Sequence, residues 1–328
     1  MALSPAPRRP RLLALRALGL GDFLTGVPAL RAVRRGFPDH EVVLAAPAVL
    51  EPLARLAGVA DGLLDTRDLA ALRWSGEAPD LAVNLHGRGP ESHRLLMDCS
   101  PERLVAFGCP EVGYVGPAWR ADEHEVLRWC RLLDSSGVPA DPTDLRLPPP
   151  VRRATFPDAV VVHPGAAHPS RRWPAARFAA VARWAAEHGH RVVVTGGPSE
   201  RELAEEVRRG AGLGAESVLA GRTDLEGLAA EIAEACLLVS GDTGVAHLAS
   251  AFGTPSVLLF GPVPPALWGP PPDGPHTVIW HGDGSGDPWG SELDPALARI
   301  TIEEVVEEME RRIALIHDRT GRTTPRSA

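Results

Sequence analysis

Residues 237–247 read Leu237-Leu-Val-Ser-Gly-Asp-Thr-Gly-Val-Ala-His247, and this stretch decides the fold of the second half of the chain. Residues 237–240 are typical of a buried strand, and residues 243–252 of a short helix. The turn between them is made of small residues, so the strand leads directly into a helix N-terminus. Free backbone N–H groups and the helix dipole make such a terminus a site for a diphosphate.

The turn also carries side chains suited to that ligand. Thr243 and His247 are four residues apart, which places them on one face of the helix. Gly244 has no side chain to keep a phosphate away from the backbone. A simpler interpretation is that Asp242 and Thr243 only cap the helix and that His247 is an ordinary, partly buried histidine.

The segments on either side of this turn continue the alternation of strands and helices. We predict strands at 159–162, 191–195, 237–240 and 256–260, and helices beginning at Pro174, at Ser199 (capping pair with Glu202), at Thr223 (capping pair with Glu226, helix 225–235), at Thr243 and at Glu303 (helix 303–316). Such a series indicates a doubly wound, Rossmann-like unit with a parallel sheet.

The first half of the chain shows the same alternation. Strands are predicted at 11–16, 42–45 and 81–84, and the Gly-rich turn 19–22 precedes a helix at 23–35. The Pro-rich stretch 145–157 is expected to separate the two halves, because proline neither continues a helix nor donates to a sheet ladder. The predicted fold class is therefore α/β, with domains at 1–152 and 153–317 and a disordered tail at 318–328.

In open parallel sheets, ligands bind beyond the carboxyl ends of the strands, and Asp22 is expected there. A carboxylate at this place could be the general base that deprotonates an acceptor. Taken alone, the local sequence favours the simpler interpretation that Asp22 is the N-cap of the following helix. After Gly19 and Gly21 the next position of a dinucleotide fingerprint is occupied by Leu24, so that fingerprint is absent and a dehydrogenase is disfavoured.

Two more strand ends carry candidate ligands for a nucleotide sugar. Arg171 or Arg172 could neutralise the charge of a leaving diphosphate, although a solvated arginine pair is also a common feature of helix starts. Glu200 could bond a ribose or a base, or could simply belong to a capped helix. No Asp-x-Asp motif is present, and residues 282–287 lack the spacing of a calcium loop. No metal and no cofactor are predicted.

The composition argues against several classes of protein, namely nucleic-acid-binding, secreted and membrane-spanning proteins. The net charge is −8, without a concentrated basic run, which argues against a nucleic-acid partner. The four cysteines show no ligand spacing, the N-terminus has no signal-peptide pattern, and no apolar run reaches the ~18 residues of a membrane helix. We expect a cytoplasmic protein without stable membrane insertion, or one that is peripheral at the inner face of the membrane.

Three separated segments together resemble glycosyltransferase family 9, the heptosyltransferase-like enzymes. They are Leu18-Gly-Leu-Gly-Asp22 with Pro28-Ala-Leu30, then His163-Pro-Gly165 with Arg172-Trp-Pro174, and then residues 240–247 with Phe260-Gly-Pro262. The similarity extends from about residue 11 to residue 315. The order and spacing of the three segments match the family.

The resemblance implies a GT-B architecture, in which two Rossmann-like domains face a central cleft. It implies that the N-terminal domain binds the acceptor and the C-terminal domain binds the nucleotide sugar, with ADP-heptose as the usual donor. The reaction would be metal-independent and inverting. Asp22 would be the general base, and the donor would be bound by Arg171, where the family commonly has lysine, and by Glu200, Asp242, Thr243, Gly244 and His247.

The acceptor is expected to bear a hydroxyl or an amine. All 34 basic residues are arginine, a composition typical of a very GC-rich bacterial genome, such as that of an actinobacterium, which would lack lipopolysaccharide. A small-molecule natural product, as in antibiotic biosynthesis, or a cell-envelope glycan is then the expected acceptor. A nucleotide-sugar epimerase and a non-catalytic sugar-nucleotide-binding module remain as alternatives.

Overall fold

The computed structural model describes residues 9–320, with side chains up to Ile316. The chain divides into two compact units, Met1–Leu145 and Arg146–Ala328. The division falls at the beginning of the Pro-rich stretch, seven residues before the predicted domain boundary. Residues that follow it are tied to the second unit: the Leu147 amide donates to the Ala251 carbonyl, and the Thr155 amide donates to Glu231 at 2.6 Å.

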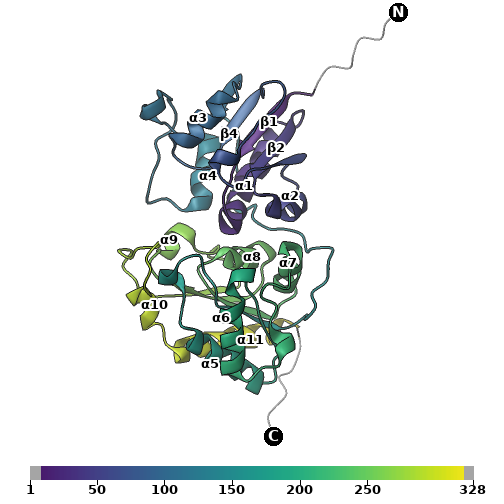
Figure 1. Ribbon diagram of the computed structural model, residues 1–328, viewed down its shortest axis with the longest axis vertical. Coiled ribbons are helices and arrows are strands. Elements are labelled where there is room, and N and C mark those ends of the chain that lie inside the picture. Colours follow the sequence, from purple (N-terminus) through teal and green to yellow (C-terminus); the bar gives the residue numbers. More distant parts are fainter. Residues whose placement is uncertain (1–8, 321–328) are drawn as a thin grey trace, which may run out of the picture. The chain divides into compact units, whose positions relative to one another are not determined.

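The first unit is built on a five-stranded parallel sheet with the strand order β3-β2-β1-β4-β5. Its elements, most of which are labelled in Figure 1, are β1 (Arg11–Leu15), α1 (Leu20–Gly36), β2 (Glu41–Ala46), α2 (Glu51–Ala57), β3 (Gly62–Asp65), β4 (Leu81–Asn84), α3 (Glu91–Asp98), β5 (Arg103–Val105) and α4 (Glu125–Asp134). The central strand β1 is apolar and buried from Leu12 to Leu15, as parallel strands covered on both faces require. Helix α1 packs against α4.

The second unit repeats this plan with the strand order β10-β9-β8-β6-β7. Its elements are β6 (Val160–His163), α5 (Ala175–Glu187), β7 (Val192–Val194), α6 (Arg201–Ala211), α7 (Leu225–Ala233), β8 (Leu237–Gly241), α8 (Gly244–Phe252), β9 (Ser256–Phe260), α9 (Pro265–Trp268), β10 (His276–Trp280), α10 (Pro295–Arg299) and α11 (Ile302–Thr320). Val218 forms a parallel bridge with Val194 beside β7. With that bridge counted as a strand, the order in chain sequence is 3-2-1-4-5-6, the Rossmann order.

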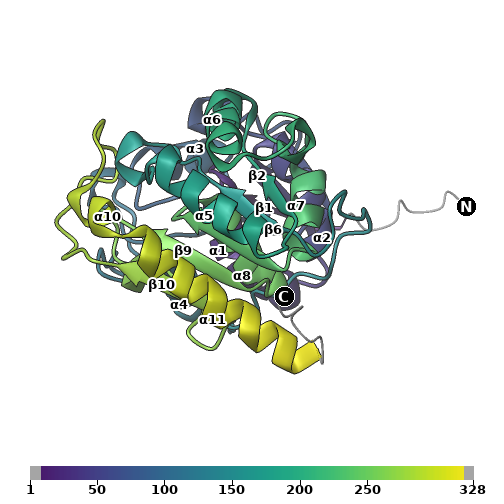
Figure 2. The same cartoon turned by 90° about the horizontal axis from the view of Figure 1, so that it is seen from below.

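Helices cover the second sheet on both sides. Helix α11 packs on β8 and β9 beside α5, and Figure 2 shows it running across the sheet. Helix α8 contacts the same two strands and also α7. The predicted core positions of α5, namely Phe178, Val181, Ala182 and Ala185, are all buried, so the i, i+3, i+4, i+7 pattern identified its inner face correctly.

Most predicted elements are confirmed, and the differences concern helix ends and sheet edges. Helix α1 begins at Leu20, not at Phe23. The capping pairs Ser199/Glu202 and Thr223/Glu226 are wrong: α6 has no side-chain cap at its own N-cap residue, and Asp224 caps α7 by accepting the Gly227 amide at 2.8 Å. An aspartate one residue nearer the helix offers a better-placed carboxylate than Thr223.

Strands β3, β5 and β10 were not predicted, and each forms an edge of its sheet. Gly62–Asp65 has exposed residues at both ends, so it lacks the apolar run of a central strand. The predicted tail overlaps α11, which extends to Thr320. The remainder of that prediction, 321–328, lies outside the described residues.

Candidate active site

Asp22 lies just past the carboxyl end of β1, in the first turn of α1. The N-cap residue is Gly19, which has an extended backbone and makes no side-chain cap, so the alternative in which Asp22 is the N-cap is wrong. Asp22 is instead the third helical residue, and its side chain is partly buried. Burial is the main reason that the pKa of the Asp22 carboxyl is raised; the charge of Arg16 opposes this rise and the charge of Glu125 adds to it. A carboxylate with a raised pKa is suited to accept a proton near neutral pH.

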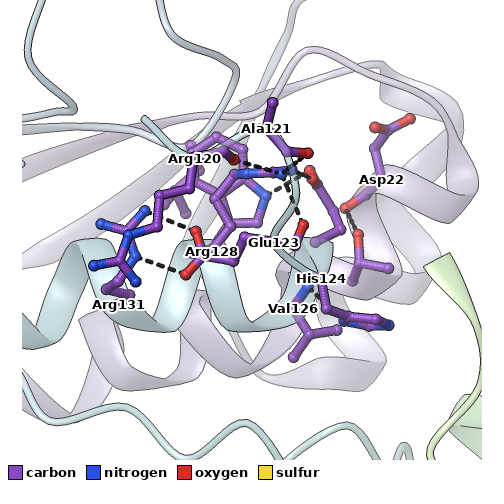
Figure 3. A network of polar contacts seen from close by, with 12 residues as sticks. Asp22, Arg120, Ala121, Glu123, His124, Val126, Arg128 and Arg131 are labelled. Carbon is purple, nitrogen blue, oxygen red and sulfur yellow. Dashed lines mark hydrogen bonds and ion pairs between the residues drawn. The ribbon is translucent and has the colours of Figure 1, made fainter. Parts of the chain in front are cut away.

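The main chain of Asp22 is held by polar groups beneath it. Its carbonyl oxygen accepts hydrogen bonds from Arg16 Nε and, at 3.0 Å, from Thr25 Oγ1. Figure 3 shows the Asp22 carboxylate pointing away from this polar network. The side chain is thus left for chemistry while the main chain is fixed.

His86 is a further titratable side chain at this edge of the first sheet. It follows β4, the strand that neighbours β1, and its amide donates to Asn84 Oδ1 at 3.1 Å. Burial, aided by the Arg16 charge, lowers the pKa of His86 to about 4, so the imidazole is neutral at physiological pH. Its Nδ1 atom is buried and makes no hydrogen bond within residues 9–320.

In the second unit, Asp242 and Arg171 form an ion pair at the carboxyl end of β8. Arg171 Nη2 lies 2.7 Å from Asp242 Oδ2 and also donates to the Asp242 carbonyl. Asp242 is 5% exposed, whereas the Arg171 side chain is 24% exposed. Burial raises the pKa of Asp242, and Arg171 opposes that rise. Of the two arginines considered, only Arg171 contacts this turn; Arg172 is exposed and donates to the Ala166 carbonyl at 2.8 Å.

The first turn of α8 presents the predicted phosphate-binding surface. Thr243 is its N-cap, and its Oγ1 accepts the Val245 amide at 3.2 Å. Thr243, Gly244 and His247 are all partly exposed, so this face of the helix is open to a ligand. The His247 ring meets the Trp268 ring edge-to-face at 5.9 Å. Capping by Thr243 and ligand binding are compatible, because the cap uses only one of the terminal amides.

Glu200 belongs to the same edge of the second sheet. Its Oε2 accepts the Gly197 amide at 2.7 Å, just after β7, and its carboxylate lies over Gly165, just after β6. A Cβ at residue 165 would be 2.0 Å from Glu200 Oε1, so only glycine permits this approach. At the end of β6, His163 is buried and its Nδ1 lies 3.0 Å from Thr195 Oγ1; burial lowers the pKa of His163.

The structure therefore brings the six predicted donor-binding residues to the carboxyl edge of the second sheet, and Asp22 to the carboxyl edge of the first. Sequence reasoning missed Arg16, Glu125 and His86. Arg16 follows the apolar run of β1 directly and so looked like an ordinary strand end. Among residues 9–316, no group of three or more His, Cys, Asp or Glu side chains is arranged to hold a metal ion. No helix there combines the length and the apolar character of a membrane span.

Two α/β units, each built on a parallel sheet with charged and polar side chains at its carboxyl edge, have the architecture of the GT-B glycosyltransferases. Residues 117–283 match the model of glycosyltransferase family 9 (heptosyltransferase). Lipopolysaccharide heptosyltransferase 3 of Escherichia coli (strain K12) is 32% identical, and the alignment covers 89% of this chain and 94% of that protein. A second Escherichia coli lipopolysaccharide heptosyltransferase 3 is 34% identical over 113 residues, 34% of this chain and 33% of its own length. The chain belongs to glycosyltransferase family 9.

A solved structure supports the fold over most of the chain. It is described as E. coli ADP-heptose lps heptosyltransferase II, with a TM-score of 0.76 and 21% sequence identity, and the match covers 94% of this chain and 99% of that one. The family model and the K12 relative confirm the predicted family, and the solved structure confirms the predicted α/β fold of the GT-B type.

Proposed function

We propose that this glycosyltransferase transfers a heptose from ADP-heptose to a hydroxyl- or amine-bearing acceptor, with inversion at the anomeric carbon and without a metal ion. The observation that carries the proposal is the carboxyl edge of the second sheet. There an arginine, an open helix N-terminus and a glutamate lie at the ends of the strands β6, β7 and β8. The resemblance in motifs and the solved E. coli enzyme that is described with ADP-heptose support this donor.

In this mechanism the second unit binds the donor. Backbone amides at Thr243 and Gly244 and the α8 dipole stabilise the charge that develops on the departing ADP. Arg171 supplies the positive charge. Because the carboxylate of Asp242 is buried against Arg171, its role is to orient that guanidinium, and it does not contact the diphosphate. Glu200 bonds the nucleoside, and His247 contacts the sugar or the diphosphate.

Asp22 removes the proton from the acceptor. The acceptor oxygen or nitrogen forms a bond to the anomeric carbon as the bond from that carbon to the diphosphate oxygen breaks. Attack from the face opposite the diphosphate inverts the configuration. The proton goes to the Asp22 carboxylate, whose raised pKa suits a base that must be ionised at neutral pH and yet accept a proton during attack.

For the acceptor we propose a cell-envelope glycan in preference to a small-molecule natural product. The relatives are named lipopolysaccharide heptosyltransferases, and the match to the K12 protein covers both units of this chain. The arginine-only composition argues for a bacterium with a GC-rich genome, so the glycan itself need not be lipopolysaccharide. We propose that the enzyme acts in the cytoplasm or at the inner face of the membrane, a location that is consistent with a nucleotide-sugar donor.

The decisive experiment is calorimetric titration of the chelator-treated protein with ADP, UDP, GDP and ADP-heptose. We expect ADP and ADP-heptose to bind and the other two nucleotides to bind at least tenfold more weakly. Glu200→Gln should weaken ADP binding about tenfold, since a hydrogen bond to a charged group is lost. Glu202→Gln, at an exposed position of α6, is the matched control and should bind normally.

Each other outcome excludes a defined part of the proposal. Preference for UDP or GDP would overturn the donor. Turnover abolished by the chelator and restored by a divalent cation would overturn metal independence. Conversion of donor without acceptor would indicate an epimerase, and absence of nucleotide binding would indicate a non-catalytic module. An NMR spectrum of the product that shows a retained anomeric configuration would overturn inversion.

A further inference from the structure

Arg16 is a fully buried cation at the end of the central strand of the first sheet. It directly follows β1, its amide donates to the Ala45 carbonyl at 2.9 Å, and its side chain is 0% exposed. Removing a guanidinium from water is costly unless every donor finds a strong acceptor. A position in the sheet core that holds arginine and not a hydrophobic residue therefore requires a specific reason.

The acceptors of Arg16 come from three different elements. Nε donates to the main-chain carbonyl of Asp22, and Nη1 donates to the main-chain carbonyl of Leu85 after β4. Nη2 donates to Thr25 Oγ1 at 3.1 Å and to Glu125 Oε1 at 3.2 Å. One planar guanidinium thus joins the first turn of α1 to the end of β4 and to α4.

Helix α1 is shaped to admit this guanidinium. A Cβ on Gly26 would lie 2.6 Å from Arg16 Nε, so a side chain at that position would push Arg16 away from the helix. Thr25 Oγ1 also contacts the Asp22 carbonyl. Arg16, Thr25 and Gly26 therefore converge on the turn that carries Asp22.

Glu125 fixes the orientation of Arg16. It is 5% exposed, and its Oε1 also accepts the Trp129 indole N–H at 2.7 Å. Its Oε2 accepts from Arg128 Nη1, and Arg128 Nη2 in turn donates to the carbonyls of Arg120 and Glu123 at 3.0 and 2.8 Å. Figure 3 shows Arg128 among the residues of this network, beside Asp22. Because each partner is itself anchored, Arg16 has one position open to it.

We propose that Arg16 and Glu125 are positioning residues for the general base: Arg16 holds the main chain of Asp22, and Glu125 orients Arg16 and balances its charge. The inference rests on the proposed role of Asp22. A purely structural role would be met as well by apolar residues of similar volume, since buried ion pairs seldom stabilise more than such a replacement. The contact of Arg16 with the main-chain carbonyl of Asp22 gives the pair a function that apolar residues cannot supply.

The charges near Asp22 affect its pKa, so the inference can be tested through the pH dependence of the reaction. Arg16 lowers the pKa of Asp22 and Glu125 raises it, while the backbone amides of Gly19 and Asp22 lower it. His86, on the neighbouring strand end, is neutral. When Glu125 loses its charge, the positive charge of Arg16 is no longer balanced, and the pKa of Asp22 must fall.

The first test is therefore the pH dependence of kcat/KM in Glu125→Gln, a nearly isosteric change. The acidic limb, along which Asp22 becomes protonated, should move to lower pH. Glu123→Gln is the matched control, because Glu123 lies two residues away and pairs with Arg131 at 2.6 Å. The control should keep the wild-type acidic limb. An unshifted limb in active, folded Glu125→Gln would overturn the role of Glu125.

The second test separates positioning from folding. Arg16→Lys keeps the charge but cannot reach all its acceptors at once, and Thr25→Val removes one contact to the Asp22 carbonyl. For Arg16→Lys we expect kcat to fall about 10- to 100-fold, as for a base displaced by a fraction of an ångström, with donor Kd unchanged. Thr25→Val should reduce kcat in the same direction by less. Wild-type kcat in both folded variants would overturn the role of Arg16.

Asp22→Asn distinguishes failure of this inference from failure of the proposed function. If Asp22→Asn retains turnover, Asp22 is not the base and both are wrong. If Asp22→Asn loses turnover while Glu125→Gln matches Glu123→Gln and Arg16→Lys matches wild type, the proposed function stands and only the positioning pair is wrong.

Discussion

Asp22 and Asp242 each follow a buried parallel strand closely, and each contacts an arginine, but the arginines engage different atoms. In the first unit Arg16 bonds the main-chain carbonyl of Asp22, and the carboxylate points away from it. In the second unit Arg171 pairs with the carboxylate of Asp242 at 2.7 Å. Aspartate and arginine at the carboxyl ends of parallel strands therefore leave the carboxylate clear of the arginine in one unit and pair the two side chains in the other.

The two sites also differ in which residue of the arginine and aspartate pair is buried. Arg16 and Glu125 lie in the core beneath Asp22, so the charges stay behind the helix turn and the aspartate is nearer to solvent. In the second unit the aspartate is the buried partner, and the arginine reaches outward. The proposed base must contact its substrate, whereas a residue proposed to orient an arginine need not contact a ligand.

The largest difference should appear in turnover. Asp22→Asn should lower kcat about 1,000-fold, because general base catalysis typically contributes 10²–10⁴-fold, and should leave donor affinity within twofold of wild type. Product formation and calorimetric donor binding measure the two effects. Turnover within tenfold of wild type would remove the distinction between the two aspartates.

The next effect concerns the stability of the second unit. Arg171→Met leaves the buried Asp242 carboxylate without its partner and should lower the free energy of unfolding at pH 7 by about 1–3 kcal/mol. Burial raises the folded-state pKa of Asp242 above its ordinary 3.8, so the ionised form costs stability at higher pH and this cost disappears as the pH falls toward 3.8. Urea unfolding at pH 7 and at acidic pH should show the loss shrinking.

Arg172→Met provides the comparison for that experiment. Arg172 is exposed and contacts only a main-chain carbonyl among its described hydrogen bonds, so its replacement should change stability by less than about 0.5 kcal/mol at either pH. Equal losses for Arg171→Met and Arg172→Met would contradict a structural ion pair at Asp242.

A smaller effect with the opposite sign is expected in the first unit. Burial raises the folded-state pKa of Asp22, so its ionised carboxylate costs stability at pH 7, and Asp22→Asn should raise Tm by a few degrees. The gain should vanish as the pH falls toward 3.8, where the carboxyl is protonated in both states. Thermal unfolding across this pH range tests the prediction.

Asp61→Asn is the control with reversed sign. Burial alone would raise the pKa of Asp61, but the Val42 amide and Arg34 outweigh burial and lower it. Its replacement should therefore reduce Tm at pH 7. A fall in Tm for Asp22→Asn as well would show that Asp22 is a stabilising residue and not one retained for catalysis.

The smallest effect is expected for Arg171→Lys. Lysine keeps the charge but loses the planar guanidinium that contacts both the carboxylate and the carbonyl of Asp242. Because lysine retains the positive charge that the proposed donor site requires, we expect donor Kd to rise only about three- to tenfold and kcat to change little. A loss as large as that in Arg171→Met would show that the fork geometry, and not the charge, is what the site requires.

Much of the architecture was predictable because its signals are local. Local residues are enough to recognise the buried apolar runs of β1, β8 and β9 and the small-residue turn before α8. The edge strands β3 and β5 were missed because partly exposed residues leave no continuous apolar pattern. The capping pairs were misplaced because the cap depends on which carboxylate reaches the first free amides.

The sequence by itself determined the alternation of strands and helices, the family, and the placing of Asp22 and residues 242–247 at strand ends. Only the tertiary structure decided what each charged group contacts. Arg16 and Glu125 are 109 residues apart, and Arg171 and Asp242 are 71 apart. Apolar periodicity follows from the burial of each local segment, so it can be recognised in the sequence. The partner of a buried charge comes from a distant segment that meets it only after folding, so a local sequence pattern cannot predict that partner.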